Sequence, residues 1–323
     1  MNAWSHDKPV EKSADALGVT VPEFFIVGNP KSGTTALYEM LRRHPQLYMP
    51  DVKEPLFFDR DVHPGIERSE RHPDTLEGYL RLFAAAEPGQ RAGEASSGCL
   101  RSQTAAARIG ELEPNARIIA VLREPASFLR SLHLELLKDH LETETDLRRA
   151  MEREQRIREQ KPMLWYSTDR VQYVEQLRRY DAVFPPEQIL VLIYDDFRAD
   201  NEGTVRKVLR FLDVEDSLPV GVTKANTTVR VRSPRAYGIV RSLYLGRGRA
   251  ARAANVGIKA LTPQWLRHSG LGAVRRSMLY GKPRPADQEL MLELRRGFKG
   301  EVVALSAYLG RDLVSLWGYD EVS

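Results

Sequence analysis

A lysine and three hydroxyl side chains surround a glycine-rich loop near the start of the chain, in a pattern that suits an anion. An apolar run from residue 24 ends at Gly28, and apolar residues then recur at helical spacing up to Leu41. A strand, a short glycine loop and a helix start present backbone N–H groups and the positive end of the helix dipole to a phosphate. The predicted phosphate-binding residues are Lys31, Ser32, Gly33, Thr34 and Thr35.

The position of the lysine excludes the usual nucleoside-triphosphate loop. That motif has Lys and Ser or Thr directly after its second glycine, whereas Lys31 precedes Gly33 by two residues. An ordinary strand-to-helix turn that contains a lysine is the alternative for the glycine spacing alone. The whole string from Pro30 to Thr35 favours a phosphate site.

Two acidic residues are candidates for proton transfer or for acceptor contacts. Lys53 and Glu54 lie between prolines and are followed by two phenylalanines, and apolar surroundings would make Glu54 a better proton acceptor. A surface ion pair is the alternative reading of the same two residues. Glu94 lies in the small-residue stretch 93–98, which suits the end of a strand.

A second candidate anion site follows the apolar run 116–122. Arg123 comes directly after this run, and Ser131 lies eight residues further on, within a predicted helix. A guanidinium at a strand end and a hydroxyl on the next helix could converge on one anion.

Alternating strands and helices must position these residues. Mostly apolar runs without alternation indicate buried parallel strands. We predict an α/β fold, a single domain whose central parallel sheet is flanked by helices. Lys31, Glu94 and Arg123 would then gather at the carboxyl ends of the strands. Predicted strands cover 24–28, 93–98, 116–122 and 189–194, and predicted helices cover 37–43, 74–86, 101–112, 142–160, 167–180, 203–212 and 287–309.

Length and composition set the broad organisation. A chain of 323 residues can bury a large core, so we expect a loose leader over 1–20 and one domain over 21–323. The single cysteine, Cys99, suits a reducing compartment, and the acidic start of the chain does not resemble a signal peptide. No apolar stretch reaches the length of a membrane span. These features together predict a cytoplasmic protein.

Residues 217–286 contain 14 lysines and arginines and no acidic residue. Such asymmetry favours contact with a polyanion or a membrane surface. Bulky apolar residues among the arginines of its later part suit an interfacial helix. The alternatives are a solvated insertion or a pair of amphipathic helices packed on the core.

Four stretches, taken in order, resemble the sulfotransferases that use 3′-phosphoadenosine 5′-phosphosulfate (PAPS). The match covers most of residues 22–215 and the C-terminal part of the chain. The branch that it resembles most contains the heparan sulfate N-sulfotransferases and many bacterial relatives. The matching stretches are Pro30 to Thr35 (the 5′-phosphosulfate loop), Lys53-Glu54-Pro55-Leu56-Phe57-Phe58, Gly93-Glu94-Ala95-Ser96, and Arg123-x-Pro125 with Ser131 (the 3′-phosphate signature).

The resemblance implies an enzyme that moves a sulfuryl group from PAPS to a hydroxyl, or less readily an amine, and leaves PAP. Lys31 would stabilise the leaving phosphate, and Glu54 would be the base. Lys53, Glu94 and Ser96 would contact the acceptor, which could be a glycan, a glycolipid or another small molecule. The family needs no divalent cation, and we expect no metal and no nucleic acid partner.

The basic segment 217–286 departs most from the family pattern. Many relatives cover the 3′-phosphate with a basic loop at this point, and Arg230, Arg232 and Arg235 are the candidates for that lid. Its later part would face the acceptor or an anionic membrane. Two rival functions remain at this stage: a nucleotide-binding, kinase-like enzyme, and an inactive basic adaptor for membranes or nucleic acid.

Overall fold

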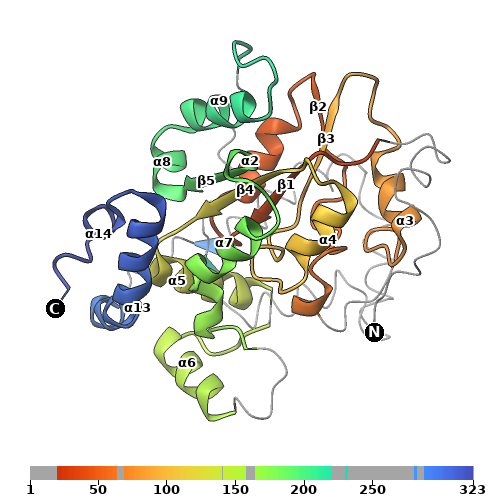
Figure 1. Ribbon diagram of the computed structural model, residues 1–323. Coiled ribbons are helices and arrows are strands. Elements are labelled where there is room, and N and C mark those ends of the chain that lie inside the picture. The colour runs from red at the N-terminus through yellow and green to blue at the C-terminus, as the bar shows by residue number, and fades with distance from the viewer. Residues whose placement is uncertain are drawn as a thin grey trace, which may run out of the picture. The chain divides into compact units, whose positions relative to one another are not determined.

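The computed structural model of the chain describes residues 20–63, 69–139, 141–157, 164–219, 221, 230–231, 280–281 and 287–322 (Figure 1). Two compact units are formed. The first comprises Met1–Phe128, Ser167–Asn226 and Leu294–Ser323, and the second comprises Leu129–Tyr166 and Thr227–Glu293.

The first unit contains a five-stranded sheet in the order β2-β3-β1-β4-β5, and every pairing is parallel. This arrangement confirms the predicted α/β fold with a central parallel sheet. A parallel sheet is covered on both faces, which explains why its strands are rich in apolar residues without alternation. The strands are β1 (Phe24–Gly28), β2 (Leu47–Tyr48), β3 (Arg91–Ala95), β4 (Arg117–Leu122) and β5 (Ile189–Ile193).

Helices cover both faces of the sheet. In Figure 1, α4 and α7 lie on the opposite side of the strands from α2 and α9. Helices of the first unit are α2 (Thr34–Leu41), α3 (Leu76–Leu80), α4 (Ala105–Leu112), α7 (Tyr173–Asp181), α8 (Tyr194–Ala199), α9 (Asn201–Phe211) and α14 (Leu313–Leu316). Helix α6 (Leu147–Arg156) and the paired strands β6 (Arg230–Val231) and β7 (Tyr280–Gly281) belong to the second unit, and α5 (Pro125–Lys138) and α13 (Gln288–Leu309) have residues in both.

Alternate residues of β1 pack against opposite faces of the sheet. Phe24 and Ile26 are buried in a cluster with residues of α2, β4, β5, α8 and α9. Phe25 points to the other face, where its ring meets the edge of Phe58 at a centroid distance of 5.7 Å. Phe57 stacks on Tyr79 at 4.4 Å on the same side. The aromatic pair that follows Glu54 therefore anchors its loop in the core.

The element boundaries differ from the predictions at several points. The two-residue strand β2 is too short to leave a pattern in the sequence. The predicted strand 189–194 ends at Ile193, and the helix α8 begins at Tyr194. Within the charged stretch 142–160, the described residues 142–157 include α6, which the Asp146 side chain caps by accepting a hydrogen bond from the Arg149 amide.

Most of the basic segment 217–286 lies outside the described residues, as do residues 1–19. The predicted leader, lid and membrane-facing surface therefore stay predictions. Among the helices of the described ranges, none combines the length and the apolar character that crossing a membrane requires.

Close packing at β3 gives a test of the fold. A Cβ added at Gly93 would lie 2.3 Å from the Phe24 ring, so we expect Gly93→Ala to lower the free energy of unfolding by about 1–3 kcal/mol. Gly297 is the matched control, because its helical position has nothing within 4 Å. We expect Gly297→Ala to raise stability by roughly 0.5–1 kcal/mol. Urea unfolding of both variants measures the difference, and equal effects would contradict the packing argument.

Candidate active site

The glycine loop joins β1 to α2 and is held against β4. The Asn29 amide donates to the Val121 carbonyl at 2.8 Å, which fixes the loop at the carboxyl end of the neighbouring strand. Helix α2 begins after Gly33, whose φ of 91° is in the left-handed region, and no side chain of the described structure caps this helix start. A Cβ at Gly33 would meet the Phe197 ring at 3.0 Å. The position directly before α2 therefore suits only glycine, and the first backbone amides of the helix follow it without a side-chain cap.

The hydroxyl residues of the loop lie in the positions that the sequence predicts. Ser32 and Thr34 are buried, and Thr35 is partly exposed in the first turn of α2. Lys31 has a φ of 61°, a left-handed conformation that non-glycine residues adopt at some cost. Such a backbone turn is typical of anion-binding loops, in which successive N–H groups converge.

Arg123 lies directly against this loop. Its guanidinium donates to the Lys31 carbonyl at 2.8 Å and lies over the Tyr194 ring at 4.6 Å from the ring centre. Its own carbonyl accepts a hydrogen bond from the Tyr173 hydroxyl at 2.9 Å, and Asn29 donates to that same hydroxyl. Burial lowers the pKa of Arg123 from its ordinary value, although Tyr194 and nearby acids oppose this. The structure thus brings Arg123 and the phosphate loop together.

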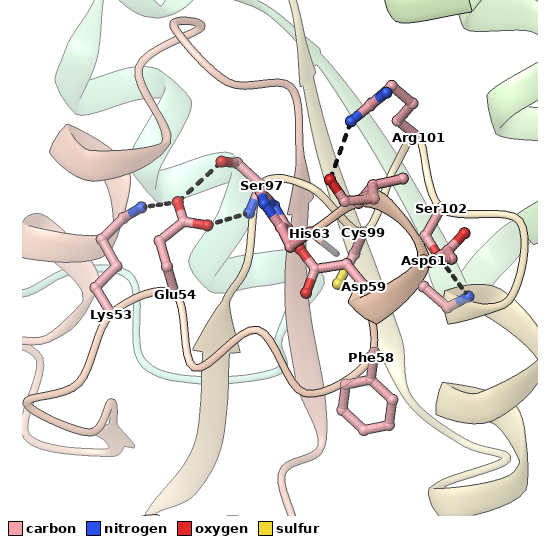
Figure 2. A network of polar contacts seen from close by, with 12 residues as sticks. Lys53, Glu54, Phe58, Asp59, Asp61, His63, Ser97, Cys99, Arg101 and Ser102 are labelled. Carbon is pink, nitrogen blue, oxygen red and sulfur yellow. Dashed lines mark hydrogen bonds and ion pairs between the residues drawn. The ribbon is translucent and has the colours of Figure 1, made fainter. Parts of the chain in front are cut away.

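Glu54 lies on the loop between β2 and α3, and three hydrogen bonds hold its carboxylate (Figure 2). Lys53 donates to Oε1 at 2.5 Å, and the Ser97 hydroxyl donates to the same oxygen at 2.8 Å. The Ser97 amide donates to Oε2 at 3.0 Å. The Glu54 side chain is 31% exposed, so its surroundings are polar and partly open. The apolar environment expected for Glu54 is wrong.

Glu94 occupies the apolar environment instead. It projects from β3, its exposed fraction is 1%, and its Oε2 has no hydrogen-bond partner in the described part of the chain. Burial, with Asp59 and Glu54 as charged neighbours, raises the pKa of Glu94 to about 8. Burial thus favours the neutral form of Glu94, whereas the Glu54 carboxylate accepts hydrogen bonds from Lys53 and Ser97.

The remaining predicted residues have no contact with this group among the described ones that shows a binding role. Ser131 is on α5 in the second unit, and its buried hydroxyl has no partner among the described residues. Arg232 and Arg235 are outside the described residues, and of Arg230 only the backbone is described, in β6. Ser96 is buried. The roles of all five of these residues and of Glu94 in binding stay predictions.

Three residues of this site were not among the predicted ones. Ser97 donates twice to Glu54, Tyr173 bridges Asn29 and Arg123, and Tyr194 stacks on Arg123. Tyr194 could have been found, because it follows a buried strand that neighbours β4. Nothing in the local sequence of Ser97 or Tyr173 indicates a partner so distant in the chain. In the part of the chain that the structure describes, no His, Cys, Asp and Glu residues group as metal ligands.

Comparison with known proteins identifies a family. The model of the sulfotransferase domain family matches residues 21–225. Human carbohydrate sulfotransferase 15 is 28% identical over 251 residues, which cover 60% of this chain and 44% of that protein. Heparan sulfate glucosamine 3-O-sulfotransferase 3A1 of Mus musculus is 26% identical over 196 residues, covering 60% of this chain and 46% of that protein. The chain thus spans about half the length of the curated relatives it matches.

A solved structure supports the same relationship over a greater length. The crystal structure of a sulfotransferase from Alicyclobacillus acidocaldarius matches with a TM-score of 0.65 and 26% identity. The match covers 92% of this chain and 99% of that one. The fold of the sheet and its flanking helices is therefore that of a sulfotransferase.

The cytoplasmic location predicted from the sequence is wrong. The matching relatives are carbohydrate and heparan sulfate sulfotransferases, and a further one, from Dictyostelium discoideum, is a membrane-associated sulfotransferase with 33% identity over 105 residues (32% of this chain, 21% of that protein). The cysteine argument fails for a physical reason. Cys99 is completely buried, so its thiol is shielded from oxidants and carries no information about the compartment.

The raised pKa of Glu94 predicts how stability changes with pH. Between its ordinary value of 4.5 and about 8, the folded protein holds a proton that the unfolded chain has released. The contribution of Glu94 to stability therefore falls as the pH rises through this window, by about 1.4 kcal/mol for each pH unit. Glu94→Gln resembles the neutral acid, so its stability relative to the parent should increase from pH 5 to pH 8. Urea unfolding across this range measures the effect.

Glu111 on the exposed side of α4 is the control for this prediction. Glu111→Gln should change stability by a similar amount at every pH. If the curves of Glu94→Gln and the parent ran parallel, the assignment of a neutral buried acid would be contradicted.

Proposed function

Since this chain belongs to the sulfotransferase family, we propose that it transfers a sulfuryl group from PAPS to a hydroxyl of a carbohydrate acceptor. The observation that supports this most is that the candidate residues follow the carboxyl ends of three adjacent strands. The phosphate loop follows β1, Arg123 follows β4, and the residue that holds Glu54 follows β3. These three strands are neighbours in the sheet.

The phosphate loop fits the sulfated end of the donor. Gly33 lies at the start of α2 without a side-chain cap, and a side chain there would press against Phe197. The uncapped helix start suits the anionic end of a ligand. PAPS, when bound, supplies a sulfuryl group attached to a phosphate leaving group. Lys31, Ser32, Thr34 and Thr35 would hold this end, and Arg123, which lies against the same loop, would bind the 3′-phosphate of the same donor.

Glu54 is the proton acceptor in this proposal. As the acceptor oxygen forms its bond to sulfur, the hydroxyl must lose a proton, and the bond between sulfur and the leaving phosphate breaks. An ionised carboxylate can accept about four hydrogen bonds, and donors from Lys53 and Ser97 occupy three of these positions. Among the described residues, no donor takes the fourth position, which the acceptor hydroxyl would occupy. Lys31 stabilises the charge that grows on the leaving phosphate.

We propose carbohydrate acceptors because two similar proteins are a carbohydrate sulfotransferase and a heparan sulfate sulfotransferase. A panel of O-desulfated heparan sulfate oligosaccharides and a neutral glycolipid, incubated with radiolabelled PAPS, would test this class. Transfer of label to an oligosaccharide supports the proposal. A parallel incubation contains radiolabelled ATP in place of PAPS. Transfer of label from ATP, without transfer from PAPS, would favour the kinase-like alternative.

Arg123→Ala should weaken the binding of PAP about 10- to 100-fold, because a charge-assisted contact is lost. Calorimetry with PAP, without added metal, measures the affinity. Arg117 is the matched control, since it lies at the opposite end of the same strand, where it pairs with Asp213. Arg117→Ala should leave the affinity for PAP unchanged, and an equally unchanged affinity in Arg123→Ala would contradict the assignment.

Glu54→Gln keeps the shape of the side chain but removes the proton acceptor. We expect kcat to fall roughly 10²- to 10⁴-fold, while the affinity for PAP stays near that of the parent. The measurement is PAP release from PAPS with the best acceptor of the panel. Near-normal turnover in this variant would show that another residue is the base.

A further inference from the structure

We propose that Ser97 is a positioning residue that orients Glu54 and sets its place relative to the phosphate loop. This inference rests on the proposed function of Glu54 as the proton acceptor. Ser97 is not part of the motifs matched in the sequence. It lies 43 residues after Glu54, and the fold brings the two into direct contact.

Ser97 contacts both oxygens of the Glu54 carboxylate. Its amide donates to Oε2 at 3.0 Å, and its hydroxyl donates to Oε1 at 2.8 Å. Two donors from one residue fix the plane of the carboxylate as well as its position, as paired contacts do in general. Figure 2 shows Ser97 and Lys53 on either side of the Glu54 carboxylate.

Lys53 cannot provide the same orientation. Its ammonium is a point charge on a flexible side chain and attracts the carboxylate without fixing its plane. Lys53 also lies next to Glu54 in the same loop, so it moves with the residue that it contacts. Ser97 belongs to the turn after β3, a different segment from the loop of Glu54. Its hydrogen bonds therefore fix Glu54 relative to the sheet.

The turn that carries Ser97 is fixed to the central strands. The Cys99 amide donates to the Ser96 carbonyl at 3.1 Å, and the Leu100 amide donates to the Val27 carbonyl of β1 at 2.7 Å. On the other side, the Tyr180 hydroxyl donates to the Cys99 carbonyl at 2.9 Å. This turn therefore has little freedom to shift along the sheet.

The same turn lies close to Gly28, the last residue of β1, which leads into the phosphate loop. A Cβ added at Gly28 would lie 2.7 Å from the Leu100 Cβ and 3.0 Å from the Ser97 carbonyl oxygen. Ser97 thus lies against the start of the phosphate loop with its backbone and holds Glu54 with its side chain. One residue links the part that would hold the donor to the part that would accept the proton.

The buried Asp59 and the partly exposed His63 lie on the far side of the turn. A Cβ at Gly98 would lie 2.2 Å from Oδ2 of Asp59 and 2.6 Å from Nε2 of His63. Asp59 is completely buried and lies 3.3 Å from His63. Asp59 and His63 thus lie close against the backbone of the residue that follows Ser97, and only a glycine fits there without a shift.

Asp61 provides an internal comparison for the experiment. It accepts a hydrogen bond from the Ser102 hydroxyl at 2.6 Å and one from the Gln103 amide at 2.7 Å. This pair has the same chemistry as the pair on Glu54 but lies at the start of α4 (Figure 2). Ser102→Ala is therefore a matched control, in which a serine hydroxyl is also removed from a carboxylate.

Ser97→Ala removes the hydroxyl donor and leaves the amide. We expect kcat for sulfuryl transfer to the best carbohydrate acceptor of the panel to fall about 10- to 100-fold, with the affinity for PAP and the KM for the acceptor nearly unchanged. Ser97→Thr keeps a hydroxyl and should recover most of the lost turnover. Ser102→Ala should lower the melting temperature without this loss of kcat.

A double-mutant cycle separates positioning from a merely structural role. If Ser97 acts through Glu54, adding Ser97→Ala to Glu54→Gln should lower kcat no further. A further fall in that background, or full turnover in Ser97→Ala alone, would overturn the positioning role. Full turnover in Glu54→Gln would instead overturn the proposed base itself, so the two failures are distinguishable.

A crystal structure of Ser97→Ala with PAP provides a readout that needs no acceptor. The Glu54 carboxylate should then rotate away from its position in the parent or occupy more than one rotamer. An unchanged, single conformation of Glu54 would overturn the inference.

Discussion

Close packing of β3 and its following turn against both ends of β1 is the constraint on which the site depends. At the start of the strand, Gly93 leaves room for the Phe24 ring, and at its end Gly28 leaves room for the turn after β3. A side chain at either glycine would separate the strands. The separation would also move the phosphate loop away from Glu54, because both are held through the same turn. The geometry of the site therefore depends on the close packing at these two glycines.

Two carboxylates at this site have opposite environments. Glu54 is partly exposed and receives hydrogen bonds from Lys53 and Ser97, whereas Glu94 is dry and its pKa is raised to about 8. Environments that separate two acids in this way also separate what they can do. The raised pKa of Glu94 favours its neutral form, which adds no second negative charge beside Glu54, the residue proposed as proton acceptor. The burial of Glu94 thus favours a site that binds an anionic donor.

The sequence was sufficient to predict the architecture and the residues at strand ends. Long apolar runs and the string around Lys31 depend on local pattern, and both correspond to observed elements. The environments of Glu54 and Glu94 could not be predicted, because they depend on which distant side chains fold back onto each residue. Aromatic neighbours in the sequence of Glu54 point into the core, while Glu54 itself faces the Ser97 amide. Adjacent residues of an irregular loop need not share an environment.

The backbone of the Glu54 loop explains how an irregular segment can hold the Glu54 carboxylate in one place. Glu54 and Leu56 have φ values of 59° and 55°, on either side of Pro55, and such left-handed conformations are costly for residues other than glycine. They persist where the surroundings fix the chain on both sides. The Glu54 amide donates to the Ala95 carbonyl at 3.0 Å, and Phe57 is anchored among aromatic rings two residues beyond Pro55. The loop is thus fixed by β3 before the proline and by the core after it, and the side chain of Glu54 projects from a backbone with little freedom to move.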